Sequence, residues 1–149
     1  MQSHLRIPVL NMLDEAMAQI ASRYAGRLVG LLATSGTIES GVYAAAAERA
    51  HVQIMQPDEE HQALVMDAIY GVEGVKADFT EGKCRSDLRL AIDHLAQRGA
   101  GVILLGCTEL PLLFPQTESF DAAGQAVALL DPTLLLASAC VRHACAASS

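Results

Sequence analysis

Hydrophobic residues along the chain alternate between short continuous runs and longer segments in which they recur every three or four positions. A short continuous run is typical of a strand buried on both faces, and the longer spacing is typical of an amphipathic helix. Within 58–72, Val65, Ala68 and Ile69 share one helical face, and Asp58 can cap the helix. The pattern predicts strands at 7–11, 27–34, 51–57, 100–106 and 126–131, and helices at 12–24, within 35–50, and at 58–72, 84–99 and 132–147.

Helices separate the predicted strands, and these strands are apolar on both sides. This arrangement is typical of a parallel sheet covered on two faces. The length of 149 residues fits one domain with a sizeable core. We therefore expect an α/β fold with a parallel sheet of about four strands and helices on both faces.

Composition and charge restrict the classes of partner. The chain is 52% apolar and 18% charged, as a folded domain is, and its net charge is −7. An acidic chain without a basic stripe repels phosphate backbones, so we expect no nucleic-acid partner. No apolar run reaches the roughly 18 residues needed to cross a bilayer, and the first residues lack the plan of a secretory signal. We expect no membrane partner and a cytoplasmic location.

The chain has four cysteines, at positions 84, 107, 140 and 145. They form no C-x-x-C pair and match no zinc spacing, so we expect neither disulfides nor a metal site. Cys84 falls near the start of a predicted helix, where a structural role is favoured. Cys140 and Cys145 fall in a predicted helix, where packing among alanines is the simplest interpretation.

Ligands of open parallel α/β sheets bind outside the carboxyl ends of the strands. Small and hydroxyl-rich segments follow two of the predicted strands here, and such segments can present backbone N–H groups to a carboxylate or phosphate. The alternative is that their Ser and Thr residues serve only as helix caps. The residues at these strand ends are Thr34, Ser35, Gly36 and Thr37, then Cys107, Thr108 and Glu109, and finally Asp131.

Cys107 stands where a buried strand gives way to polar residues. A following helix N-terminus would favour its thiolate, and an ordinary thiol pKa of about 8.5 needs only a modest field to bring the proton within reach. The residues alone leave three roles open for this cysteine: packing, nucleophile or general base.

At these strand ends the sequence resembles the aspartate/glutamate racemase superfamily of cofactor-independent amino-acid racemases. The resemblance is carried, in the family's order, by VGLLATSGT at 29–37, IYGVEGVKADFTEGK at 69–83, RGAGVILLGCTELPLL at 98–113 and LLDPTLLLA at 129–137. Glu109 resembles the aspartate racemase branch, because the glutamate racemases usually carry histidine there.

The resemblance implies a reaction that needs no cofactor and no metal. In the family, two pseudo-symmetric α/β domains face a cleft and each offers one cysteine: one thiolate removes the α-proton and the other thiol returns a proton on the opposite face. Cys107 would be the second of these cysteines, and Lys76, or less favourably Lys83, would approach the substrate. The implied substrate-binding residues are Thr34, Ser35, Gly36, Thr37, Lys76, Thr108 and Glu109.

The resemblance also implies a domain plan. Residues 1–26 correspond to the end of the first racemase domain, 27–125 to the second domain, which carries Cys107, and 126–149 to a closing strand and helix that return to the first domain. Most of the N-terminal half, with its cysteine, is expected to be missing. We therefore expect self-association into a homo-oligomer, with exchange of the C-terminal helix as one route.

The expected function is PLP-independent racemisation of acidic amino acids such as aspartate or glutamate, with a small carboxylate or amino acid as substrate. Two alternatives stay open. One is a non-catalytic remnant that binds a carboxylate, and the other is a relative that needs a single cysteine, such as a decarboxylase or isomerase.

Overall fold

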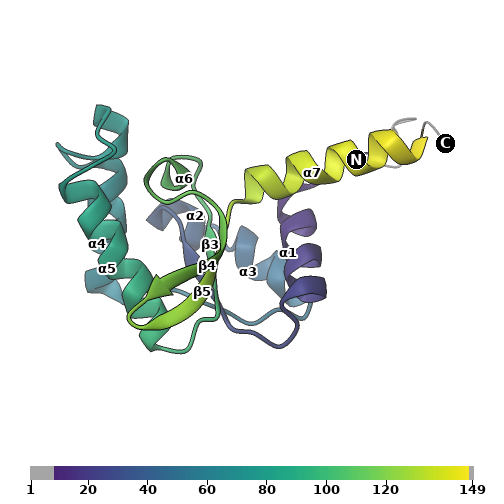
Figure 1. The fold of residues 1–149 in the computed structure, drawn as a ribbon, viewed down its shortest axis with the longest axis horizontal. Coiled ribbons are helices and arrows are strands. Elements are labelled where there is room, and N and C mark those ends of the chain that lie inside the picture. Colours follow the sequence, from purple (N-terminus) through teal and green to yellow (C-terminus); the bar gives the residue numbers. More distant parts are fainter. Residues whose placement is uncertain (1–8, 148–149) are drawn as a thin grey trace.

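The apolar runs form one sheet in the computed structural model, which describes residues 9–147 (Figure 1). The sheet has five strands in the order β2-β1-β3-β5-β4, and the first four run parallel. Both faces of β1 and β3 are fully buried, as continuous apolar runs require. The strands are β1 (Val29–Leu32), β2 (Ile54–Met55), β3 (Val102–Leu105), β4 (Thr117–Ala122) and β5 (Gln125–Leu130).

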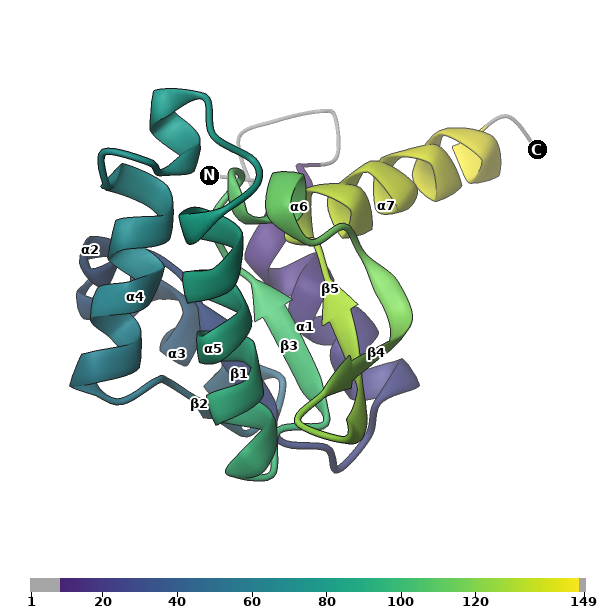
Figure 2. The same cartoon turned by 60° about the vertical axis from the view of Figure 1, so that its left-hand side comes forward.

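Helices cover the two faces of this sheet (Figures 1 and 2). Helices α4 and α5 pack on one face and α1 and α3 on the other, so the buried residues divide into one apolar cluster per face. The predicted α/β class and two covered faces are therefore confirmed. The helices are α1 (Met12–Arg23), α2 (Ser35–Glu39), α3 (Val42–Arg49), α4 (Glu59–Tyr70), the 3-10 turn η2 (Val75–Ala77), α5 (Lys83–Gln97), α6 (Leu110–Leu113) and α7 (Pro132–Ala147).

The edge strand β4 was not predicted from the sequence. It pairs antiparallel with β5 through a tight turn at Ala123 and Gly124, whose φ angles are 51° and 78°. Two successive positive φ values are the geometry of a two-residue hairpin turn. Most of β4 is exposed or half-buried, so its sequence, TESFDA, lacks the apolar run that marks the other strands.

Two other predicted boundaries differ from the structure. The segment 35–50 forms two short helices separated by Ser40 and Gly41, instead of one loop and one helix. Residues 9–11 of the predicted strand at 7–11 are not in a strand, and its first two residues lie outside the described part of the chain.

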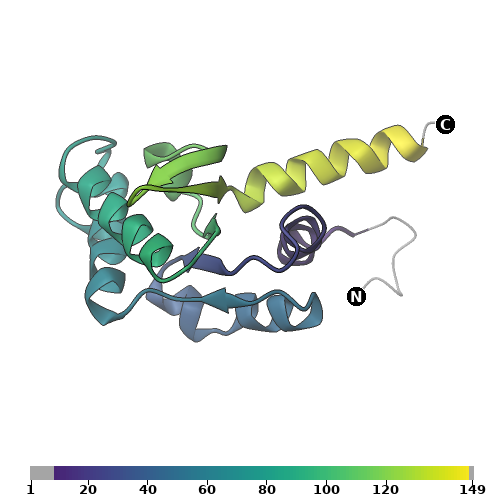
Figure 3. The ribbon, with the colours of Figure 1, turned by 60° about the horizontal axis from the view of Figure 1, so that its bottom comes forward.

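Helix α7 leaves the sheet and extends away from the body of the domain (Figures 1 and 3). Its first half packs on α1: Leu135 is buried, and its carbonyl accepts a hydrogen bond of 3.1 Å from Gln19 Nε2. Its second half is exposed, including 63% of Val141. Within residues 9–147, none of the helices combines the length and apolar content of a bilayer-spanning segment.

The cysteines outside the strand ends differ in their surroundings. Cys84 is buried, and its Sγ donates to the carbonyls of Phe79 at 3.5 Å and Glu81 at 3.4 Å, as expected of a structural cysteine. Cys140 and Cys145 lie on α7 as predicted, but both are exposed. The prediction that they pack among alanines is therefore wrong for this chain, because α7 projects beyond the surface that it could cover.

Two leucines of α5 test how far the core depends on the sheet-facing side of this helix. Leu88 is fully buried, whereas Leu90 is 50% exposed. Leu88→Ala is expected to lower the free energy of unfolding by about 2–5 kcal/mol, because it leaves a cavity between helix and sheet. Leu90→Ala, the matched control, should change it by less than about 0.5 kcal/mol. Urea denaturation followed by circular dichroism measures both, and equal losses would contradict the assigned core.

Candidate active site

The carboxyl ends of β1 and β3 bring the two polar segments of the sequence side by side. These strands are neighbours in register up to Leu32 and Leu105, and the N–H of Gly106 donates to the Leu32 carbonyl at 2.7 Å. Thr34 and Cys107 therefore leave the sheet from adjacent positions. Figure 2 shows α6, which follows Cys107, at the arrowhead end of β3 and β5.

Close approach of the two strand ends requires a glycine at position 106. A Cβ on Gly106 would lie 2.9 Å from Leu31 Cδ1 and 3.1 Å from the Leu32 carbonyl oxygen. A side chain there would push Cys107 away from the end of β1.

The Glu109 carboxylate is the centre of the candidate site. Its Oε2 accepts hydrogen bonds from Cys107 Sγ at 2.7 Å and Thr108 Oγ1 at 3.1 Å. Its Oε1 lies 2.9 Å from Lys76 Nζ, in an ion pair. The structure thus joins four of the predicted site residues through one carboxylate.

These contacts set the protonation states of the thiol and the carboxyl group. Hydrogen bonds from Cys107 and then Lys76 lower the pKa of Glu109 to about 2. Burial first, and then the hydrogen bond to Glu109, raises the pKa of Cys107 to about 11. At neutral pH the pair is therefore a thiol donating to a carboxylate. The expected helix-stabilised thiolate is wrong, because the acidic neighbour and partial burial outweigh the single turn of α6.

Lys76 reaches this site from η2, which follows the end of α4. Its Nζ also lies 5.3 Å from the centroid of the Tyr70 ring, a cation–π contact that helps to fix the long side chain. The ion pair with Glu109 raises the pKa of Lys76, so this lysine stays charged. The other lysine considered, Lys83, instead pairs with Asp87 on its own helix, and it is not joined to the Cys107 cluster.

The segment 34–37 forms a local cap at the end of β1. Thr34 Oγ1 accepts from the Thr37 N–H at 3.2 Å and lies 2.9 Å from Thr37 Oγ1, so Thr34 is the N-cap of α2. The Ser35 N–H is directed to Met66 Sδ at 3.3 Å, a weak acceptor that a carboxylate could replace. A Cβ on Gly36 would meet no atom within 4 Å, so the approach to this cap is open.

Two residues near the strand ends were not identified from the sequence. Tyr43 of α3 is buried with its hydroxyl 3.4 Å from the Gly106 carbonyl, and burial followed by the neighbouring Cys107 and Asp131 raises its pKa to about 12. Gln62 of α4 donates through Nε2 to the Ala33 carbonyl at 2.9 Å. Tyr43 is the one aromatic residue of an alanine-rich helix, a signal that could have identified it.

Asp131, at the end of β5, has a structural role. Its Oδ1 accepts from the Thr133 N–H at 2.9 Å at the start of α7, and its own N–H donates to Gln116 Oε1 at 2.9 Å. Its hydrogen bonds therefore fix the exit of α7 from the sheet.

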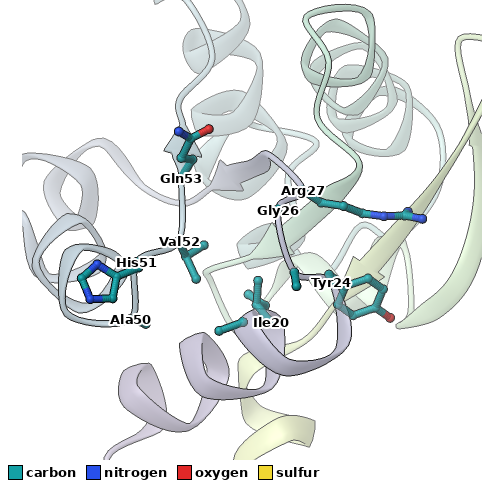
Figure 4. A pocket seen from close by; sticks show the side chains of 10 residues that line it. Ile20, Tyr24, Gly26, Arg27, Ala50, His51, Val52 and Gln53 are labelled. Carbon is teal, nitrogen blue, oxygen red and sulfur yellow. The ribbon is translucent and has the colours of Figure 1, made fainter.

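A cavity of about 420 Å³ lies away from this site, beside the amino ends of β1 and β2 (Figure 4). Its lining includes Tyr24, Arg27, His51 and Gln53, and none of the residues predicted at the strand carboxyl ends. We therefore place the candidate active site at the Cys107 cluster, where the acid–base groups gather.

Fold and site together define an α/β domain with a thiol that donates to a carboxylate at the carboxyl edge of a parallel sheet. The chain belongs to the Asp/Glu/Hydantoin racemase family, whose model matches residues 1–140. This membership confirms the resemblance inferred from the sequence and supports a racemase-like function.

Known proteins similar to this chain agree with that family. A glutamate racemase from Deinococcus radiodurans is 33% identical over 85% of this chain. The crystal structure of a candidate Asp/Glu racemase from Yersinia pestis matches 93% of it with a TM-score of 0.76 and 29% identity. An aspartate racemase homologue from Pyrococcus horikoshii shares the fold over 90% of it, with a TM-score of 0.69 and 22% identity.

The chain spans about half the length of these proteins. It covers 46% of the Deinococcus racemase, 56% of the Yersinia protein and 55% of the Pyrococcus protein. The activity of a whole family member therefore cannot be assigned to this chain from the similarity alone.

Neutralising the carboxylate tests the electrostatics of the site. Glu109→Gln removes a negative charge that raises the pKa of Cys107 and replaces a charged acceptor by a weaker neutral one, so this pKa is expected to fall below its value of about 11. The pH dependence of Cys107 alkylation by iodoacetamide, followed by peptide mass spectrometry, should then have its midpoint at lower pH. Glu118→Gln is the control, since Glu118 is bonded to Tyr24 at 2.6 Å and not to a cysteine. An unchanged midpoint in Glu109→Gln would refute the assigned pairing.

Proposed function

We propose that this chain supplies one proton-transfer face of a cofactor-independent racemase for acidic amino acids, aspartate or glutamate. The observation that carries the proposal is the Cys107 thiol, half-buried at the strand ends and directed at Glu109 Oε2 at 2.7 Å. Family membership and the similarity to a glutamate racemase support the class of reaction.

The protonation state found here suits the proton-donating half of a racemisation. A base on the opposite face of the substrate removes the α-proton, and the C–H electron pair remains on a planar carbanion. Cys107 then gives its S–H proton to the near face of Cα, which inverts the stereocentre and leaves a thiolate. The other enantiomer reacts by the same steps in reverse, starting from the form in which Cys107 is a thiolate and the group on the opposite face is protonated.

Glu109 and Lys76 act as positioning residues in this proposal. The carboxylate orients the S–H bond, and the ammonium at 2.9 Å offsets the negative charge that builds up when the thiol loses its proton. A thiol that donates to a carboxylate resists ionisation before the substrate binds. This limits alkylation and oxidation of Cys107 in the free protein.

The substrate carboxylate is proposed to bind at the cap formed by Thr34, Ser35, Gly36 and Thr37, beside Thr108. The Ser35 N–H, which is directed to the Met66 thioether in this structure, would donate a hydrogen bond to the carboxylate. The open space beside Gly36 would accommodate the substrate. No cofactor takes part in the proposed steps, and the thiol chemistry suits the reducing cytoplasm.

Isotope exchange tests the proposal at the reacting atom. Incubation with L- or D-aspartate and glutamate in D₂O should replace the Cα proton by deuterium, followed by ¹H NMR. Cys107→Ser is expected to slow exchange at least about 100-fold, because a serine hydroxyl is a poor acid–base group at neutral pH.

Cys84→Ser is the matched control, since Cys84 donates to the backbone carbonyls of Phe79 and Glu81, as a serine hydroxyl also can, and should leave the rate unchanged. If neither amino acid exchanges, or if Cys107→Ser exchanges as fast as the wild type, the catalytic proposal fails and a carboxylate-binding remnant becomes the better interpretation.

The raised pKa of Cys107 favours a second candidate, protonation of an enediolate after decarboxylation. That reaction needs one thiol that is protonated at neutral pH, as this one is. Release of CO₂ from an arylmalonate without amino-acid exchange would select it over racemisation.

The opposite face of the substrate is proposed to come from a second copy of the chain, assembled through the exposed half of α7. Val141→Asp places a charge on this half and should weaken self-association at least about tenfold, measured by sedimentation equilibrium. Val72→Asp is the control, because Val72 is 91% exposed in the turn after α4. A monomeric wild type, or equal effects of the two variants, would count against assembly through α7.

A further inference from the structure

A cluster of two histidines and an aspartate lies where α4 begins beside the last turns of α5. Asp58 is the N-cap of α4, His61 lies in its first turn, and His94 comes from α5. The two imidazole rings stack with centroids 3.8 Å apart and planes within 9° of parallel. The sequence spacing did not indicate this group, because packing of the two helices brings His94 to residues far from it in the chain.

The Asp58 carboxylate links the two imidazoles. Its Oδ1 accepts from the His61 backbone N–H at 2.9 Å and lies 2.6 Å from His61 Nδ1. Its Oδ2 lies 3.5 Å from His94 Nε2, and one ligand atom from each of the three residues falls within 4.8 Å of the others.

We propose that Asp58, His61 and His94 bind a zinc ion at the surface between α4 and α5, with water completing the coordination. Two imidazole nitrogens and a carboxylate oxygen are a common three-ligand set for Zn²⁺. Ligand atoms about 2.0–2.2 Å from a tetrahedral ion stand roughly 3.3 Å apart, close to the 3.5 Å between Asp58 Oδ2 and His94 Nε2. Binding needs the His61 ring to give up its hydrogen bond to Oδ1 and turn toward the ion. It also needs His94 Nε2 to give up the weak hydrogen bond of 3.4 Å that it accepts from the Asp58 backbone N–H.

The electrostatics around the cluster favour a cation. The Asp58 carboxylate places one negative charge beside both imidazoles. Glu60 adds a negative charge, and Arg98, whose NH1 lies 3.4 Å from His94 Nε2, is the opposing positive charge.

This site is separate from the candidate active site. The cluster lies at the start of α4, whereas Lys76 and the Cys107 cluster lie beyond its end. A bound ion would link the start of α4 to the last turn of α5. The inference does not depend on the proposed racemase activity.

Isothermal titration of the metal-free protein with Zn²⁺ tests the inference. We expect saturable binding of one ion per chain at this site, weakened at least about tenfold by His61→Gln and by His94→Gln. His143→Gln on α7 is the control and should bind as the wild type does. Arg98→Gln removes the opposing charge and should tighten binding, a gain that misfolding would not produce.

The spectrum of the Co²⁺-loaded protein identifies the ligand atoms, since thiolate ligation adds a sulfur-to-cobalt charge-transfer band that nitrogen and oxygen ligands lack. Absence of that band, together with the losses above, supports the site. No binding by the wild type, binding by His61→Gln and His94→Gln as tight as that of the wild type, or loss of binding in His143→Gln with a thiolate band would overturn it.

Discussion

The candidate site of this domain depends on the single carboxylate of Glu109. A thiol, a hydroxyl and an ammonium converge on its two oxygens, and its pKa of about 2 records how strongly they hold the ionised form. The hydrogen bond from Cys107 to Glu109 also raises the pKa of Cys107, so the protonation states of the thiol and the carboxylate are coupled. Removing the carboxylate would release Lys76, Thr108 and the thiol together.

The parallel sheet explains how these groups meet. Parallel strands end at a common edge of the sheet. The segments that begin at Thr34 and Cys107 therefore leave the sheet side by side, although they lie more than 70 residues apart in the sequence. Gly106 allows the close approach, and buried Tyr43 packs beneath it with its hydroxyl toward the Gly106 carbonyl. Helix α4 then carries the chain from the imidazole cluster at its start to η2, which delivers Lys76.

The sequence was informative where hydrophobic patterns are continuous and uninformative where they are not. The buried strands β1 and β3 and the amphipathic helix α5 follow directly from their apolar spacing. Strand β4 is mostly exposed or half-buried and has a register shift, so only its pairing with β5 identifies it. Motif and position indicated Cys107, Glu109 and Lys76. The direction of the thiol pKa was not predictable, because it depends on a 2.7 Å contact and on partial burial rather than on residue type.

The sequence by itself determined the α/β class, the family and the segments that hold Cys107, Glu109 and Lys76, because periodicity and local motifs are properties of neighbouring residues. The tertiary structure decided which of those groups touch. It joined Lys76 instead of Lys83 to Glu109, kept Cys107 protonated, exposed the end of α7, and placed His94 against Asp58 and His61. These outcomes depend on contacts between side chains that the sheet and the packed helices bring together. The distances between such side chains cannot be obtained from their positions in the sequence.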